Sequence, residues 1–170
     1  RLHRAAALLD RWNVLTETGS PLGVIGSGSV WSYVEECLGA RPEPRPNTLK
    51  IGVVHPLPDE KIRALLARSE RVLVVEELDP LIEERVRALA GDAGQKVTVL
   101  GKADRLLSPV GDLDPDRVGA AVSVLYGEKP APTPPKADLS AYAPRTFTFC
   151  PGCPHRSAYT ALLNAIRALG

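Results

Sequence analysis

Residues 71–89 read RVLVVEELDPLIEERVRAL and carry the clearest structural signal in the chain. Val72–Val75 is an unbroken run of branched apolar residues, which is typical of a strand buried on both faces of a parallel sheet. Ile82, Val86 and Leu89 then recur at the spacing of one helical face. The stretch therefore predicts a buried strand that leads directly into an amphipathic helix.

The same alternation continues in both directions along the chain. Further apolar runs lie at Leu22–Ile25, Leu49–Val54 and Val97–Leu100, and patterns of helical period separate and follow them. Two Asp-Pro pairs, at residues 79–80 and 114–115, place a capping carboxylate before a proline suited to the first helical position. The alternation predicts an α/β three-layer sandwich, in which helices cover both faces of a mostly parallel sheet.

The chain divides into four expected segments. Residues 1–17 are expected to form a leading helix or connector, and residues 18–127 the α/β domain. Residues 128–148 are rich in proline and alanine and have no periodicity, so they are predicted to form a linker. Residues 149–170 are expected to start a second domain with a helix of their own.

The composition excludes several classes of protein. A net charge of +1, with both signs interspersed, argues against nucleic acid or an anionic membrane as the main partner. No apolar run reaches the roughly 18 residues of a membrane span, and no signal peptide is visible. Three cysteines, two of them in one CxxC, form no disulfide framework, so we expect a reducing, cytoplasmic compartment. The absence of methionine, even at position 1, suggests a piece of a larger protein.

In an open parallel sheet, ligands bind at the carboxyl ends of the strands. The polar residues that follow the predicted strands are Ser27, Ser29, His55, Glu76, Glu77, Lys102 and Asp104. The sequence GSGS at residues 26–29 could cradle a phosphate at a helix start, but Trp31 stands where a dinucleotide fingerprint needs a third glycine. A tight turn with serine as the helix cap is the competing interpretation.

Two other features of this edge also have a catalytic and a structural interpretation. His55 is an acid or base candidate, or a structural histidine, because no partner that completes a catalytic constellation is identifiable. Glu76 and Glu77 suit acid–base work, or one of them caps or pairs locally while the other is solvated. Cys37 falls on the apolar face of a predicted helix, so we expect it to be buried.

The segment CPGCPHR at residues 150–156 is the most specific motif in the chain. Cys150 and Cys153 could form a redox dithiol, half of a zinc site or half of an iron–sulfur site. A complete metal site is not predicted, because about two more ligands are needed and the chain has no second CxxC.

A fourth interpretation of the motif is an anion site. Gly152 lets the backbone approach a ligand, and His155 and Arg156 stand at a predicted helix start, where free N–H groups favour a phosphate. A structural turn with inert cysteines is the remaining alternative.

CPGCPHR followed by a helix of small residues resembles the start of the thiamine-diphosphate-binding domain of the 2-oxoacid:ferredoxin oxidoreductases. The segments GVIGSGSVWSYVEECL, LKIGVVHPLPDEKIRAL and RVLVVEELDPLIEERVRAL resemble the transketolase-C-terminal-like domain of the same family, in the same order. The resemblance is greatest to the large, or alpha, subunit of the indolepyruvate ferredoxin oxidoreductases. It extends from about residue 10 to the end of the chain.

The resemblance implies an enzyme that oxidatively decarboxylates an aryl 2-oxoacid, such as indolepyruvate, to an acyl-CoA. It also implies thiamine diphosphate with Mg²⁺, 4Fe-4S clusters, coenzyme A as co-substrate, ferredoxin as electron acceptor and a smaller partner subunit. By the same resemblance, the residues that border the cofactor are Cys150, Gly152, Cys153, His155 and Arg156. Pro154 and His155 stand where related enzymes typically have glycine, which leaves open whether the two cysteines ligate a cluster.

The chain lacks most of the catalytic motifs of that family. It contains no GDG…N motif for the Mg²⁺-diphosphate and no CxxCxxCxxxCP run for ferredoxin-like clusters. We therefore expect the chain alone to be inactive. The alternative function is a stand-alone small-molecule or nucleotide-binding α/β module that uses the GSGS edge.

Overall fold

The computed structural model describes residues 2–92, 94, 96–130, 140 and 149–170. The chain divides into two compact units, residues 1–133 and residues 134–170, and each is described by itself. Among the described residues, no helix has the length and apolar character that crossing a membrane requires.

The first unit contains a five-stranded sheet in the order β1-β3-β2-β4-β5. Its strands are β1 (Val14–Thr16), β2 (Leu22–Ser27), β3 (Asn47–Ile51), β4 (Arg71–Val75) and β5 (Thr98–Leu100). Strands β2 to β5 run parallel, and β1 pairs antiparallel with β3 at one edge. The predicted, mostly parallel sheet is confirmed.

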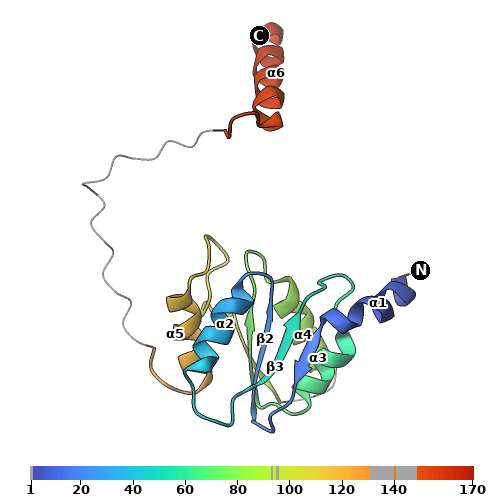
Figure 1. Cartoon of the computed structure of the whole chain (residues 1–170), viewed down its shortest axis with the longest axis vertical. Coiled ribbons are helices and arrows are strands. Elements are labelled where there is room, and N and C mark those ends of the chain that lie inside the picture. The colour runs from blue at the N-terminus through green and yellow to red at the C-terminus, as the bar shows by residue number, and fades with distance from the viewer. Residues whose placement is uncertain (1, 93, 95, 131–139, 141–148) are drawn as a thin grey trace. The chain divides into compact units, whose positions relative to one another are not determined.

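Helices cover both faces of this sheet (Figure 1). The helices of the first unit are α1 (Leu2–Leu9), the 3-10 helix η1 (Asp10–Trp12), α2 (Val30–Gly39), α3 (Asp59–Leu66), α4 (Leu81–Asp92) and α5 (Pro115–Leu125). Helices α2 and α5 pack into the core on one face, whereas α3 and α4 pack into the core on the other. This arrangement confirms the predicted three-layer sandwich.

Strand β4 shows why the apolar run at residues 72–75 has no polar interruption. Leu73 and Val75 belong to the core on the α2 and α5 face, whereas Val72 and Val74 belong to the core on the α3 and α4 face. All four side chains are at most 1% exposed. Successive side chains of a strand point to opposite faces, so a strand covered on both sides must be apolar at every position.

Strand β1 was not predicted, because the helical pattern of the first residues was extended to the connector. Helical structure ends at Trp12, and the Asn13 side chain then accepts the backbone N–H groups of Gly52 and Val53, both at 3.1 Å. The Lys61 ammonium donates to the Asn13 carbonyl at 2.6 Å. These contacts fix the segment beside β3, where Val14–Thr16 adds an edge strand.

The predicted helix caps have mixed outcomes. Asp114 caps α5 as expected, accepting the backbone N–H of Arg117 at 2.8 Å. Helix α4, in contrast, begins at Leu81, and the Glu76 carboxylate accepts the N–H groups of Ile82 and Glu83. Asp79 accepts the Leu81 N–H only through its backbone carbonyl.

The second unit contains helix α6 (Pro154–Leu169), which confirms the helix predicted after CPGCPHR. Most of the predicted linker, residues 131–139 and 141–148, lies outside the described residues.

Candidate functional site

The strand order places a topological switch point at the centre of the sheet. From β2 the chain crosses to β3 on one side, and it then returns to β4 on the other side of β2. The carboxyl ends of β2 and β4 therefore flank the crevice where an open parallel sheet usually binds a ligand. Glu76 and Glu77 follow β4 there, and the GSGS turn follows β2.

Glu76 serves as the cap of helix α4. It is 4% exposed, and its two carboxylate oxygens accept the backbone N–H groups of Ile82 at 2.8 Å and Glu83 at 2.9 Å. Burial raises the pKa of this carboxyl, and the two N–H donors and the Lys102 ammonium oppose the rise. A carboxylate with both oxygens bound to the helix start has a structural role, so Glu76 fits the capping interpretation and not the acid–base one.

Glu83, which the sequence did not single out, joins helix α4 to the loop that follows β5. It is 1% exposed and accepts the backbone N–H groups of Lys102 at 2.6 Å and Ala103 at 3.1 Å. Arg87 donates to it at 2.9 Å from the next turn of α4. A Cβ at position 101 would collide with the Glu83 carboxylate, which explains the glycine there.

Three further charged groups of the edge, Lys102, Asp104 and Glu77, are also engaged. The buried Lys102 ammonium donates to the Leu78 carbonyl, and Leu78 has a backbone φ of 51°. Asp104 accepts from Arg87 at 2.6 Å. Glu77 accepts the backbone N–H of Leu113 at 3.3 Å. The carboxyl edge is thus held by a buried polar network that orders its loops.

The GSGS turn does not form a phosphate cradle of the dinucleotide type. Ring carbons of Trp31 lie 3.1 and 3.5 Å from the position of a Gly26 Cβ, so the indole covers the first glycine. Gly28 turns the chain with a φ of +69°. The Ser29 side chain makes no capping hydrogen bond, which corrects the expectation that serine caps α2. His55 is exposed after β3.

The CPGC segment of the second unit forms a tight turn. The backbone N–H of Cys153 donates to the Cys150 carbonyl at 3.0 Å. Pro151 and Gly152 occupy the two central positions, and the φ of Gly152 is +75°. Proline followed by a residue with positive φ is the signature of a type II turn, so the glycine is required by the backbone itself.

His155 lies against the second cysteine. Its Nδ1 atom is 3.4 Å from Sγ of Cys153, which stands at the N-cap of α6. Cys153 is partly exposed, whereas Cys150, His155 and Arg156 are exposed. Pro154 at the first helical position has no N–H, so an anion at this helix start would depend on the His155 and Arg156 side chains and on the N–H groups that follow.

The donor set does not complete a metal centre. Within the described residues, no group of three or more His, Cys, Asp or Glu side chains could hold a metal ion. The turn thus offers two thiols of the four that an iron–sulfur cluster takes. Cys37 is half-buried, not buried as expected, with Sγ 3.7 Å from the Pro115 carbonyl. Burial, and next the Glu36 carboxylate, raise the pKa of its thiol.

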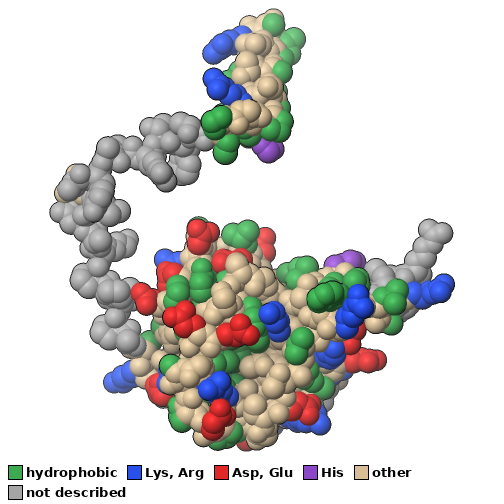
Figure 2. All heavy atoms as spheres, viewed as in Figure 1, with side chains coloured by type: hydrophobic (Ala, Val, Ile, Leu, Met, Phe, Trp, Pro, Cys, Tyr) green, Lys and Arg blue, Asp and Glu red, His purple; other side chains and the backbone are tan. Residues whose placement is uncertain are grey.

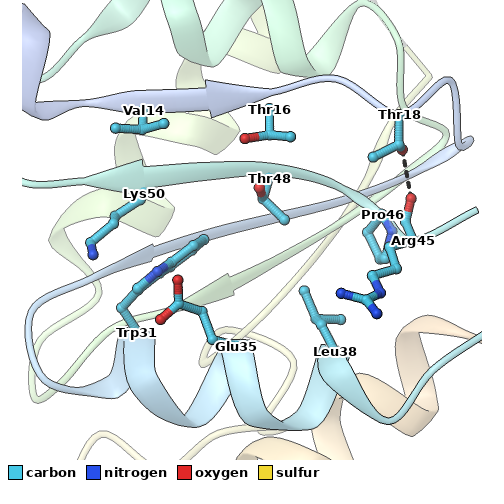
Figure 3. Close-up of a pocket in the computed structure, with 10 residues that line it drawn as sticks. All are labelled: Val14, Thr16, Thr18, Trp31, Glu35, Leu38, Arg45, Pro46, Thr48 and Lys50. Atoms are coloured by element: carbon cyan, nitrogen blue, oxygen red, sulfur yellow. Dashed lines mark hydrogen bonds between the residues drawn. The ribbon is translucent and has the colours of Figure 1, made fainter.

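A groove on the first unit was not found from the sequence. It has a volume of about 590 Å³ and lies between α2 and β1, with β3 as its floor (Figure 3). Its lining residues are Val14, Thr16, Thr18, Trp31, Glu35, Leu38, Arg45, Pro46, Thr48 and Lys50. The pairing of β1 with β3 creates this groove, so no motif in the sequence could have indicated it.

Curated proteins named indolepyruvate oxidoreductase subunit IorA are similar to most of the chain. The subunit of Methanothermobacter thermautotrophicus is 37% identical over 147 residues, which is 86% of this chain and 23% of the relative. The subunit of Methanothermobacter marburgensis is 36% identical over 177 residues, which is 100% of this chain and 27% of the relative. The subunit of Archaeoglobus fulgidus is 30% identical over 164 residues, which is 93% of this chain and 25% of the relative.

The chain thus spans about a quarter of the length of the curated relatives that it matches. No protein-family model matches it. The resemblance to the large subunit of the indolepyruvate oxidoreductases, which the motifs indicated, is confirmed by these relatives.

Proposed function

This chain belongs to the family of the IorA subunits of indolepyruvate oxidoreductases and corresponds to about a quarter of their length. We propose that it is part of a 2-oxoacid oxidoreductase. The complete cytoplasmic enzyme would convert an aryl 2-oxoacid such as indolepyruvate to an acyl-CoA, with ferredoxin as electron acceptor and a smaller subunit as partner. Thiamine diphosphate with Mg²⁺ would supply the decarboxylation chemistry, and 4Fe-4S clusters would carry the electrons.

The observation that carries this proposal is the similarity to named relatives across both units, from the sandwich to the CPGCPHR turn. The two units then have different roles. The sandwich commits its polar edge to its own loops, which suits a structural domain. The head of α6 leaves Cys150, His155 and Arg156 exposed, which suits a site that other parts of the complete enzyme finish.

At the head of α6, we assign His155 and Arg156 to an anion, either the cofactor's diphosphate or the substrate carboxylate. Both side chains can donate to an anion and both lie in the first turn of a 16-residue helix, whose N-terminus favours negative charge. Gly152 keeps the approach free of a side chain, since no heavy atom lies within 4 Å of its Cβ position. Cys150 and Cys153 could contribute two thiolates to a cluster completed elsewhere.

The experiment uses the full-length subunit with its smaller partner and measures ferredoxin reduction by indolepyruvate and coenzyme A. His155→Ala is expected to raise the apparent KM for thiamine diphosphate or for the 2-oxoacid by about ten- to a hundredfold, the loss of one charge-assisted hydrogen bond. Asn164→Ala, which changes an exposed polar residue further along the same helix, is the matched control.

Arg156→Ala tests the second side chain, with Arg167→Ala at the other end of α6 as its control. If His155→Ala and Arg156→Ala both keep the wild-type KM values, the turn is only a connector and the site assignment fails. If the wild-type enzyme shows no dependence on thiamine diphosphate, the proposed chemistry itself is wrong.

A further inference from the structure

The groove of the first unit lies on a part of the sheet that no helix of the described residues covers. On this face α2 packs against β2 and β4, and α5 packs against β4, so β3 and β1 remain open. Lys50 and Thr48 of β3 project there, opposite Val14 and Thr16 of β1. Figure 3 shows these side chains between the two strands and the helix.

The polarity of this face argues against a permanent cover. Leu49 and Ile51 of β3 point to the other face and are at most 2% exposed, whereas Thr48 is partly exposed and Lys50 is exposed. A helix packed permanently over Thr16, Thr48 and Lys50 would bury polar groups without partners, which proteins avoid. The face is therefore built for water or for a ligand that brings polar groups of its own.

Two side chains of opposite charge, Lys50 and Glu35, line the groove near Trp31. The Lys50 ammonium lies 5.9 Å from the centre of the Trp31 ring, and Glu35 follows Trp31 by one helical turn on the same side of α2. In the described part of the chain, neither Lys50 nor Glu35 has an ion pair within 4.0 Å. Trp31 is 7% exposed; its Nε1–H is buried, without an acceptor in the described residues, so this end of the groove presents the ring and not the N–H.

Away from Trp31, apolar side chains alternate with threonines in the groove lining. Leu38 and Pro46 are buried, and Val14 is 50% exposed along the open side. At the far end Arg45 is paired with Glu43 at 3.1 Å, and its carbonyl accepts the Thr18 hydroxyl. The unpaired charges are thus confined to the end that Trp31 forms.

We propose that this groove binds a small zwitterion, with an ammonium and a carboxylate next to an apolar side chain, as in a free amino acid or a dipeptide. The carboxylate is held by Lys50, beside the Trp31 ring. The ammonium is held by Glu35, and the side chain lies along Leu38 and Val14. The volume of about 590 Å³ falls within the range of small-molecule sites.

Trp31 provides a direct readout, because the chain has two tryptophans and the other, Trp12, lies outside the groove lining. In a Trp12→Phe background, L-phenylalanine and glycyl-L-phenylalanine are titrated separately while the fluorescence of Trp31 is recorded. Binding of the first identifies a free amino acid as the ligand, and binding of the second alone identifies a peptide. No saturable change with either compound at millimolar concentration overturns the proposal.

Two analogues test the contacts of Lys50 and Glu35 separately. 3-Phenylpropanoate keeps only the carboxylate, and phenethylamine keeps only the ammonium. We expect Lys50→Gln to weaken 3-phenylpropanoate roughly five- to tenfold and to leave phenethylamine unchanged, whereas Glu35→Gln should do the reverse. Glu36→Gln and Lys96→Gln, both exposed and outside the groove lining, are the matched controls.

The remaining test blocks the groove with a larger side chain. Thr48→Phe places a large side chain on the groove floor and should abolish binding of both zwitterions, with folding checked by circular dichroism. Binding that survives Thr48→Phe in a folded protein, or that ignores both charge variants, places the ligand elsewhere and overturns the proposal.

Discussion

Helices α2 to α5 each bury at least three side chains in the sandwich, whereas α6, which is longer than any of them, buries none. Both regions have helical apolar patterns in the sequence, so the pattern alone does not separate them. Figure 2 shows hydrophobic side chains on the surface of α6. Tyr159, Leu162, Leu163 and Ile166 are all between 51% and 55% exposed. The difference teaches that an amphipathic stripe predicts a helix but contributes to stability only where a partner surface meets it.

The buried network of the sandwich should give the largest effect on stability. Glu83→Ala leaves the backbone N–H groups of Lys102 and Ala103 without their acceptor and leaves Arg87 without its buried partner. We expect the free energy of unfolding to fall by about 3–5 kcal/mol, measured by urea denaturation. Glu84→Ala, an exposed neighbour on the same helix, should change it by less than about 0.5 kcal/mol. Equal losses in the two variants would contradict the structural role of the network.

The same substitution in the two regions tests the comparison directly. Ile62 is 0% exposed in the sandwich core, and Ile166 is 55% exposed on α6. Ile62→Ala should cost about 2–5 kcal/mol in urea denaturation, because it removes buried methyl groups and leaves a cavity. Ile166→Ala should cost less than about 0.5 kcal/mol in this chain. A large loss at Ile166 would show that α6 is packed in the folded chain.

The sequence predicted what depends on local pattern. The apolar runs located β2 to β5, and their unbroken character predicted burial on both faces, as Val72–Val75 confirms. Strand β1 was missed because three residues are too few for a pattern and its position depends on Asn13 contacting a loop that lies 39 residues away. The groove also depends on strand register, because the pairing of Val14 with Lys50 sets which side chains line it.

The polar edge shows a second limit of sequence reasoning. Asp79 had the sequence signature of a cap, but Glu76 reaches the helix start from the end of β4. Glu83 looked like an ordinary helix-surface residue and is buried, because the loop after β5 donates two backbone N–H groups to it. Capping by a residue outside the helix and burial of a charge both depend on tertiary contacts, which local propensity does not contain.

Glu76 also gives the sandwich a pH dependence that is tied to its fold. Burial raises the pKa of its carboxyl above the ordinary value of 4.5, despite the two backbone donors. An acid with a higher pKa in the folded state binds its proton more tightly when folded. Its contribution to stability is therefore fullest below about pH 4.5 and is lost as the pH rises through the folded-state pKa.

Glu76→Gln should remove this dependence. The difference in unfolding free energy between wild type and variant is expected to shrink as the pH rises above 4.5, with a slope of at most about 1.4 kcal/mol per pH unit. Urea denaturation at a series of pH values measures it, with Glu84→Gln as an exposed carboxyl for comparison. Parallel pH profiles for wild type and Glu76→Gln would contradict the assignment.

The smallest expected effect on stability concerns the starts of two helices that share a sequence feature. Helices α5 and α6 both begin with a proline, after Asp114 and after Cys153 respectively. Asp114 accepts the Arg117 N–H at 2.8 Å, whereas Cys153 makes no side-chain capping bond and contacts His155 instead. Asp114→Ala should therefore cost about 1 kcal/mol in urea denaturation, the usual loss for a cap.

Cys153→Ala should leave both the unfolding free energy and the helical circular dichroism signal unchanged. Cysteine is a poor capping residue, and the Cys153 sulfur makes no capping hydrogen bond to α6. The partly exposed thiol lies beside His155, so a role of Cys153 in the proposed cofactor site does not depend on capping. If Cys153→Ala instead destabilises the helix as much as Asp114→Ala destabilises the sandwich, the cysteine is a structural cap. The turn would then lose its strongest claim to be part of a cofactor site.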